Sequence, residues 1–90
     1  MKEDLLKIIN HYGINKQLKY IHSEYFELDE AILNYIKRDE DREHIGEELS
    51  DCFVMLKQFQ YYYGIEDKDI ERIMKYKIGR QLKRIDEENI

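Results

Sequence analysis

The sequence predicts an all-α fold, an up-and-down bundle of three long helices and one short N-terminal helix. The 90 residues contain no proline, and apolar residues recur three and four positions apart along most of the chain, which is the helical period. A chain of this length at 42% apolar composition can build one thin core, so we expect a single domain, 1–90.

Glycine marks the expected end of the first helix. This helix is predicted over Glu3–Tyr12, and Gly13 follows as a residue that tolerates the positive φ of a helix terminus. The second helix is expected over Asn15–Lys37. Its apolar stripe consists of Leu18, Ile21, Tyr25, Leu28, Ile32 and Tyr35, spaced like the seam of a coiled coil.

The polar run "KRDEDRE", residues 37–43, is the best candidate for a loop. A third helix then extends to about Tyr63 and ends at Gly64, and Asp67 is placed to cap a fourth helix with its side-chain oxygen. The predicted apolar positions are Ile45, Leu49, Cys52, Leu56, Phe59 and Tyr63 in the third helix and Ile70, Ile73, Met74, Ile78, Leu82 and Ile85 in the fourth.

Composition narrows the classes of function. A net charge of −5 argues against a general nucleic-acid binder, which needs a basic face. The single cysteine, Cys52, rules out an intrachain disulfide and suits a reducing compartment, and no apolar run is long enough for a membrane span. We therefore expect a cytoplasmic protein with no membrane partner. Eight Tyr and three Phe are many for this length and suggest burial against a second copy.

Two pairs of acidic residues lie at the edges of the predicted apolar stripes. Glu24 lies roughly 80° from the centre of the stripe of the second helix, and Glu48 roughly 60° from that of the third. Glu27 and Asp51 each follow three residues later, one step further out. None of the four has Lys or Arg three or four positions away, although exposed helical acids are commonly balanced in that way.

If the two long helices run antiparallel, the four carboxylates converge, and they repel one another unless a cation lies among them. Mg²⁺ prefers oxygen ligands and is often held by a few carboxylates together with substrate phosphates, and Mn²⁺ is an alternative ion. One cysteine and three scattered histidines offer no zinc spacing. In the fourth helix Lys77 and Arg80 belong to a cationic ridge that could hold a polyphosphate.

The order of these acids resembles a known family. The stretches "SEYFELDEAI" and "EELSDCFVML" carry E-x-x-E and E-E-x-x-D with twenty residues between Glu27 and Glu48, which is similar to the signature of the MazG-like, all-α nucleoside triphosphate pyrophosphohydrolases. The segments "NKQLKYIHSEYFEL" and "KYKIGRQLKRI" resemble that family's lead-in and basic closing helix. The likeness covers most of the chain, but Ser23 stands where relatives often have another acid.

The resemblance implies a Mg²⁺-dependent hydrolase that cleaves the α–β phosphate bond of a nucleoside triphosphate to a monophosphate and pyrophosphate. Glu24, Glu27, Glu48 and Asp51 would be the metal ligands and catalytic acids, and one of the outer acids could instead orient the attacking water. Gln17, Lys19, Lys77 and Arg80 would contact the substrate. The resemblance also implies a homodimer or homotetramer.

Less specific interpretations remain open. Acids on helices usually face solvent, and Lys77 and Arg80 can be surface side chains with buried stems. A non-catalytic nucleotide or metal binder would keep the acids without turnover, and a structural helical oligomer or partner-binding protein would need no metal.

Overall fold

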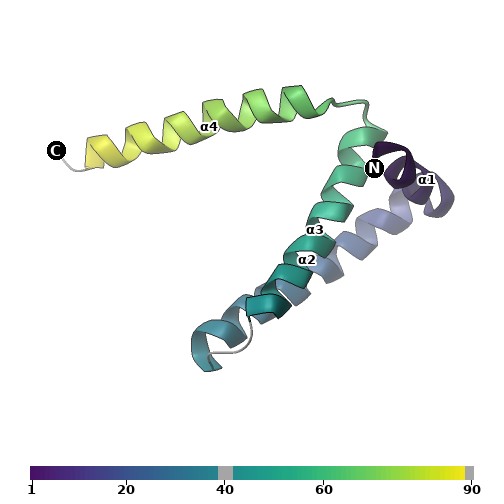
Figure 1. The fold of residues 1–90 in the computed structure, drawn as a ribbon, viewed down its shortest axis with the longest axis horizontal. Helices are drawn as coiled ribbons and strands as arrows, with labels where there is room; N and C mark the ends of the chain where they lie inside the picture. The colour runs from purple at the N-terminus through teal and green to yellow at the C-terminus, as the bar shows by residue number, and fades with distance from the viewer. Residues whose placement is uncertain (39–41, 89–90) are drawn as a thin grey trace.

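The chain folds into four helices, as the periodicity predicts. The computed structural model describes residues 1–38 and 42–88, and within them there is no strand. The helices are α1 (Lys2–Tyr12), α2 (Ile14–Arg38), α3 (Arg42–Tyr62) and α4 (Asp67–Glu88) (Figure 1). The ends of the predicted loop at 37–43 belong to α2 and α3, and its centre, 39–41, lies outside the described residues.

Two glycines end helices where the sequence places them. Gly13 has φ +88° and its N–H donates to the carbonyl of Ile9. Gly64 has φ +70°, and the N–H of Ile65 closes the end of α3 on the carbonyl of Gln60. Residues that carry a Cβ atom rarely adopt these positive φ values, so glycine lets the chain turn sharply at both points.

The core lies where α2 and α3 run antiparallel, with α1 packed across one end of the pair (Figure 1). Cys52 of α3 donates its S–H to the backbone carbonyl of Glu24 in α2, which places these two residues opposite each other. The buried apolar side chains are Leu5, Ile9, Ile21, Ala31, Cys52, Met55 and Tyr61.

The packed faces of α2 and α3 differ from the predicted stripes. Leu18, Tyr25 and Ile32 of the α2 stripe are exposed, and Leu49 and Leu56 of the α3 stripe are exposed as well. The buried positions of α2 instead include Gln17, Glu24 and Ala31. The helices are therefore rotated relative to their most apolar faces, which brings Glu24 into the contact and leaves a row of apolar side chains uncovered.

Helix α4 does not join the bundle formed by the first three helices. It extends away from the end of α3, and in the described part of the chain it packs against none of α1, α2 and α3 (Figure 1). Ile73, Met74, Ile78, Leu82 and Ile85, all from its predicted apolar stripe, are exposed. The prediction of four helices is thus confirmed, while the expected packing of the fourth is not found within one chain. No helix among the described residues combines the length and hydropathy that a membrane span requires.

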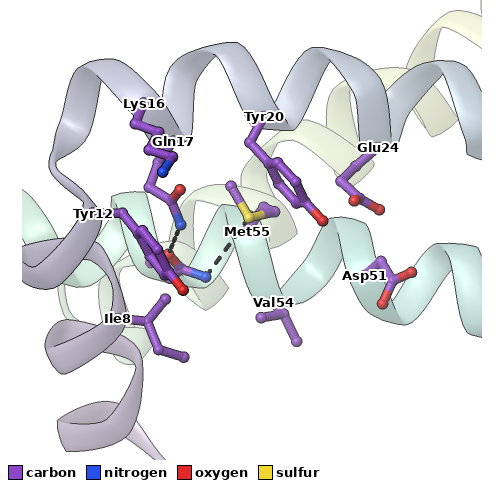
Figure 2. A pocket seen from close by; sticks show the side chains of 10 residues that line it. Ile8, Tyr12, Lys16, Gln17, Tyr20, Glu24, Asp51, Val54 and Met55 are labelled. Atoms are coloured by element: carbon purple, nitrogen blue, oxygen red, sulfur yellow. Dashed lines mark hydrogen bonds between the residues drawn. The ribbon is translucent and has the colours of Figure 1, made fainter.

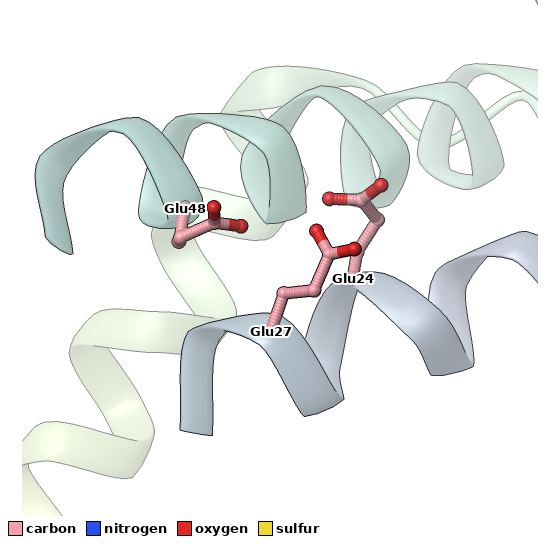
Figure 3. A group of neighbouring side chains, drawn as sticks. All are labelled: Glu24, Glu27 and Glu48. Carbon is pink, nitrogen blue, oxygen red and sulfur yellow. The ribbon is translucent and has the colours of Figure 1, made fainter. Parts of the chain in front are cut away.

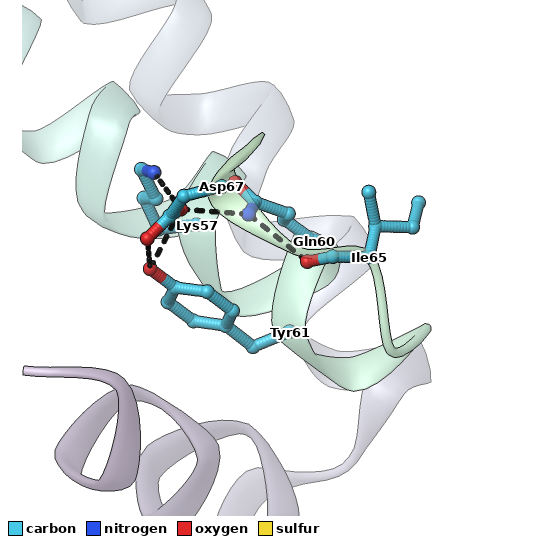
Figure 4. Close-up of polar contacts among 5 residues, drawn as sticks. All are labelled: Lys57, Gln60, Tyr61, Ile65 and Asp67. Carbon is cyan, nitrogen blue, oxygen red and sulfur yellow. Dashed lines mark hydrogen bonds and ion pairs between the residues drawn. The ribbon is translucent and has the colours of Figure 1, made fainter. Parts of the chain in front are cut away.

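A polar corner ties the start of α4 to the end of α3. The carboxylate of Asp67 accepts hydrogen bonds from Lys57 at 2.6 Å, from Gln60 at 2.9 Å and from the hydroxyl of Tyr61 at 2.9 Å (Figure 4). Gln60 also donates to the carbonyl of Ile65 in the connection. Asp67 is the first residue of α4, so the expected side-chain cap is replaced by a bond across the corner, which sets the direction in which α4 leaves.

We expect Asp67→Asn to weaken this corner and to remove the dependence of its stability on acidic pH. The hydrogen bond from Lys57, followed by those from Gln60 and Tyr61, lowers the pKa of Asp67 from 3.8 to about 2. Because the folded-state pKa is depressed, the carboxylate contributes stability that is present above about pH 4 and lost as pH falls towards 2. Urea unfolding followed by circular dichroism should show this acid-dependent loss in the wild type and not in Asp67→Asn. Asp69→Asn is the control, because Asp69 pairs with Arg72 at 3.8 Å within α4. An unchanged acid dependence in Asp67→Asn would contradict this role.

Candidate metal centre

Three of the four predicted acids meet between α2 and α3. Glu24 and Glu27 project from successive turns of α2 towards Glu48 of α3 (Figure 3). One carboxylate oxygen from each lies within 4.8 Å of the others. The i, i+3 spacing puts both α2 acids on the side that faces α3, and the antiparallel pairing of the two helices brings Glu48 to the same level.

Two oxygens of this cluster are buried without a partner. Glu24 is only 6% exposed, and its Oε2 and the Oε2 of Glu48 have no hydrogen-bond partner among the described residues. A buried carboxylate oxygen that lacks a partner costs free energy, because water no longer solvates it. The two oxygens are therefore candidates for coordinating a cation.

The environment favours the protonated forms of Glu24, which is buried, and of Glu48, which is half-buried. Burial, followed by the charges of Glu27 and Asp51, raises the pKa of Glu24 above its usual range. Burial and the same two charges also raise the pKa of Glu48, and the nearby His44, 4.0 Å away, acts in the opposite direction. A divalent cation would remove the repulsion among these carboxylates and hold them ionised.

Asp51, the fourth predicted acid, stands outside the group of three. It is exposed and points towards the rim of a pocket that Glu24 also lines (Figure 2). Its charge still acts on Glu24 and Glu48. The structure therefore brings three acids together as expected and places the fourth beside them, at the mouth of the pocket.

The pocket adjoining the acids has a volume of about 420 Å³. Gln17 and Gln58 form part of its inner wall, where Gln17 donates to Gln58 at 2.8 Å (Figure 2). This volume falls within the usual range for small-molecule sites, and such sites combine apolar walls with a few polar groups. The other lining residues are Ile8, Tyr12, Lys16, Tyr20, Glu24, Asp51, Val54 and Met55.

The four predicted substrate contacts separate into two groups. Gln17 lies in the pocket wall, whereas Lys19 is exposed and does not line the pocket. Lys77 and Arg80 lie on α4, where they line a separate hollow with Gln81 and Arg84. Because α4 packs against none of the other helices, a single chain does not bring these two cations to the acids.

Sequence reasoning missed the residues that shape the pocket around Gln17. Tyr20 lies one helical turn before Glu24, and the charge of Glu24 raises the pKa of its hydroxyl. Lys16 and Tyr12 border the same pocket, and the Lys16 ammonium lies 5.0 Å from the centre of the Tyr12 ring. In the sequence, only the position of Tyr20 four residues before Glu24 could have pointed to its place in the pocket. This spacing does not by itself distinguish a residue of a pocket wall from a core residue.

Comparisons of the chain with models of protein families, with curated proteins and with solved structures found no match. An oxygen-only donor set with two unsatisfied buried oxygens suits Mg²⁺ or Mn²⁺, which favour carboxylates.

Proposed function

We propose that this protein is a Mg²⁺-dependent nucleotide pyrophosphohydrolase that cleaves the α–β phosphate bond of a nucleoside triphosphate. The observation that supports this proposal most directly is the cluster of Glu24, Glu27 and Glu48 beside a pocket of ligand size. Two carboxylate oxygens of this cluster are buried and unsatisfied among the described residues. The order of the acids, which is similar to that of MazG-like hydrolases, supports the reaction class.

Glu24, Glu27 and Glu48 would hold the metal ion through one oxygen each. Bound Mg²⁺ would neutralise phosphate charge and lower the pKa of a coordinated water. Asp51 lies nearby at the open rim, so it would accept a proton from the attacking water or act as a fourth ligand. Glu24 is buried and Glu48 half-buried, which suits them to hold the ion at the inner side of the cluster, whereas Glu27 and Asp51 are exposed and remain accessible to water and substrate.

The pocket would receive the nucleoside part of the substrate. Tyr12 and Tyr20 offer aromatic surface, and Lys16 supplies a cation that can approach a phosphate. Gln17 and Gln58 hold each other, which keeps their remaining polar atoms in defined positions for hydrogen bonds to a ligand. Such an arrangement positions the substrate, and positioning accounts for much of catalysis in phosphoryl transfer.

The direct test is pyrophosphate release from a panel of nucleoside and deoxynucleoside triphosphates, with Mg²⁺ or Mn²⁺ present. We expect metal-dependent release of pyrophosphate and the matching monophosphate, and no reaction after chelation with EDTA. Release of orthophosphate would indicate cleavage at another bond. A complete lack of turnover across the panel, with either metal, would contradict the proposal.

The main alternative is a protein that binds a nucleotide or metal without reaction, because buried acids are also compatible with binding alone. In that case Mg²⁺ and nucleotide would raise the melting temperature while no product forms. A purely structural helical protein would show neither effect, since nothing in its fold would depend on the ion. Product formation and melting temperature, measured on the same chain in the same buffer, therefore distinguish the enzyme, the non-catalytic binder and the structural protein.

A further inference from the structure

The chain exposes more surface than a folded monomer of its mass. A folded chain of 11.1 kDa is expected to expose about 5,700 Å², whereas this one exposes 7561 Å². Its radius of gyration is 16.4 Å, against about 12 Å for a compact chain of the same length. If two copies bury this excess against each other, the interface covers about 3,700 Å² in total, which lies within the range of obligate dimers.

One uncovered apolar surface lies on the α2–α3 pair. At about 100° per residue, these side chains fall on the side of both helices that faces away from the acids and the pocket. We call this surface the hairpin face. Its members, between 37% and 72% exposed, are Leu18, Tyr25, Ile32, Ile36, Leu49, Phe53 and Leu56.

The second uncovered apolar surface runs along α4. We call it the α4 arc, and it is formed by Met74, Ile78, Leu82 and Ile85, which are between 51% and 57% exposed. With 22 residues, α4 is about 33 Å long, and α3 with 21 residues is about 32 Å long. The two helices therefore match in length, and both surfaces are apolar.

In the described part of the chain, α4 leaves the corner at Asp67 without packing on the hairpin face of its own chain. An up-and-down bundle would require α4 to turn back along α3, but the bonds from Lys57, Gln60 and Tyr61 hold its first turn in the extended direction (Figures 1 and 4). The hairpin face of a second copy is the surface that remains for the α4 arc.

Charge favours the body of another copy over other partners. Residues 72–84 of α4 contain six Lys or Arg and no acid, whereas residues 1–66 contain eight Lys or Arg and fourteen acids, a net charge of −6. Two α4 helices side by side would repel each other. The acidic remainder also opposes binding to an anionic membrane, although an amphipathic basic helix is otherwise suited to one.

We propose that two copies of this chain exchange their α4 helices, each α4 arc docking on the hairpin face of the partner. The exchange buries both uncovered surfaces without any change at the corner. It also carries the cations of α4, including Lys77 and Arg80, onto a partner whose body is acidic. The proposal concerns assembly and does not depend on the proposed enzymatic activity.

The test is the mass of the full-length chain in solution, measured by light scattering after size exclusion. We expect twice the 11.1 kDa of one chain for the wild type. The double variant Ile78→Gln, Leu82→Gln should raise the dimer dissociation constant at least about 100-fold, because two large apolar side chains lose their burial. Its matched control is Tyr76→Gln, Lys83→Gln, which alters α4 roughly 130° away from that pair and should leave the dimer intact.

A second double variant tests the receiving surface. Ile32→Gln with Phe53→Gln alters the hairpin face alone and should weaken the dimer to a similar extent, so the proposal remains testable even if the α4 variant loses its fold. A monomeric wild type would overturn the proposal, including a monomer that binds vesicles of anionic lipid. A dimer that depends on α4 alone would indicate pairing between α4 helices and would overturn it too, as would a dimer that tolerates the α4 variant.

Discussion

Glu24→Gln is expected to lower the rate of pyrophosphate release at least about 100-fold while the chain keeps its helical fold. Substitution of groups that merely support a metal ligand commonly costs 10- to 100-fold, and Glu24 is proposed as a ligand itself. The substitution keeps the size of the side chain and removes one charge from a cluster in which burial and neighbouring acids raise the pKa of Glu24. Steady-state turnover and circular dichroism on the same preparation give the measurement.

Glu30→Gln serves as the matched control for this substitution. Glu30 lies on the same helix, is exposed and is outside the cluster of three acids. We expect its activity to stay within about twofold of the wild type, since surface substitutions away from special sites have small effects. Equal activity of Glu24→Gln and the wild type would remove Glu24 from the metal centre, and equal loss in both variants would point to a general effect of charge.

Mg²⁺ is expected to raise the melting temperature of the wild type by about 10 to 20 °C at a concentration 100-fold above its dissociation constant. Binding at that excess stabilises the folded state by about 2.7 kcal/mol, and a domain of this size gains about 4–8 °C per kcal/mol. The physical source is the ion's interaction with carboxylate oxygens of Glu24 and Glu48 that have no hydrogen-bond partner within residues 1–38 and 42–88. Thermal unfolding at fixed protein concentration, with NaCl of equal ionic strength as the control, measures it.

Without metal, the same cluster should make stability depend on pH. The pKa of Glu24 is raised in the folded state, so the folded chain binds protons more tightly than the unfolded chain. The contribution of Glu24 therefore becomes more favourable as pH falls from neutral towards its ordinary 4.5, and Mg²⁺ should weaken that dependence. Glu24→Gln should melt higher than the wild type in EDTA and respond less to Mg²⁺. If Mg²⁺ and NaCl of equal ionic strength have the same effect, the cluster does not bind the ion.

Local chemistry made the helices and their ends predictable. Gly13 and Gly64 end helices because they adopt positive φ, and this preference belongs to the residue wherever the chain places it. The pairing of Glu24 and Glu27 with Glu48 also followed from spacing, because acids three apart share one side of a helix and antiparallel packing aligns the two helices.

The degree of burial of each acidic side chain was not predictable from sequence spacing. Of the predicted α2 stripe, Ile21 is buried and Leu28 and Tyr35 are half-buried, but Leu18, Tyr25 and Ile32 are exposed. Periodicity therefore placed the centre of the buried face too far from Gln17, Glu24 and Ala31, which are buried although they are less apolar. The rotation of the helix depends on contacts with α1 and α3, including the bond from Cys52 to the backbone of Glu24. That rotation buries Glu24 and leaves Glu27 and Asp51 exposed, so these two acids remain open to water.

Periodicity and residue preference thus determined the all-α class, the four helices and the acids worth testing, because each depends on neighbours within one or two turns. The rotation of α2, the pocket beside Glu24 and the outward course of α4 were decided by contacts between residues distant along the chain or across a turn. The bonds from Lys57, Gln60 and Tyr61 to Asp67 illustrate the reason. The same helical pattern is compatible with α4 folded back or extended, and a few polar atoms at the corner choose between them.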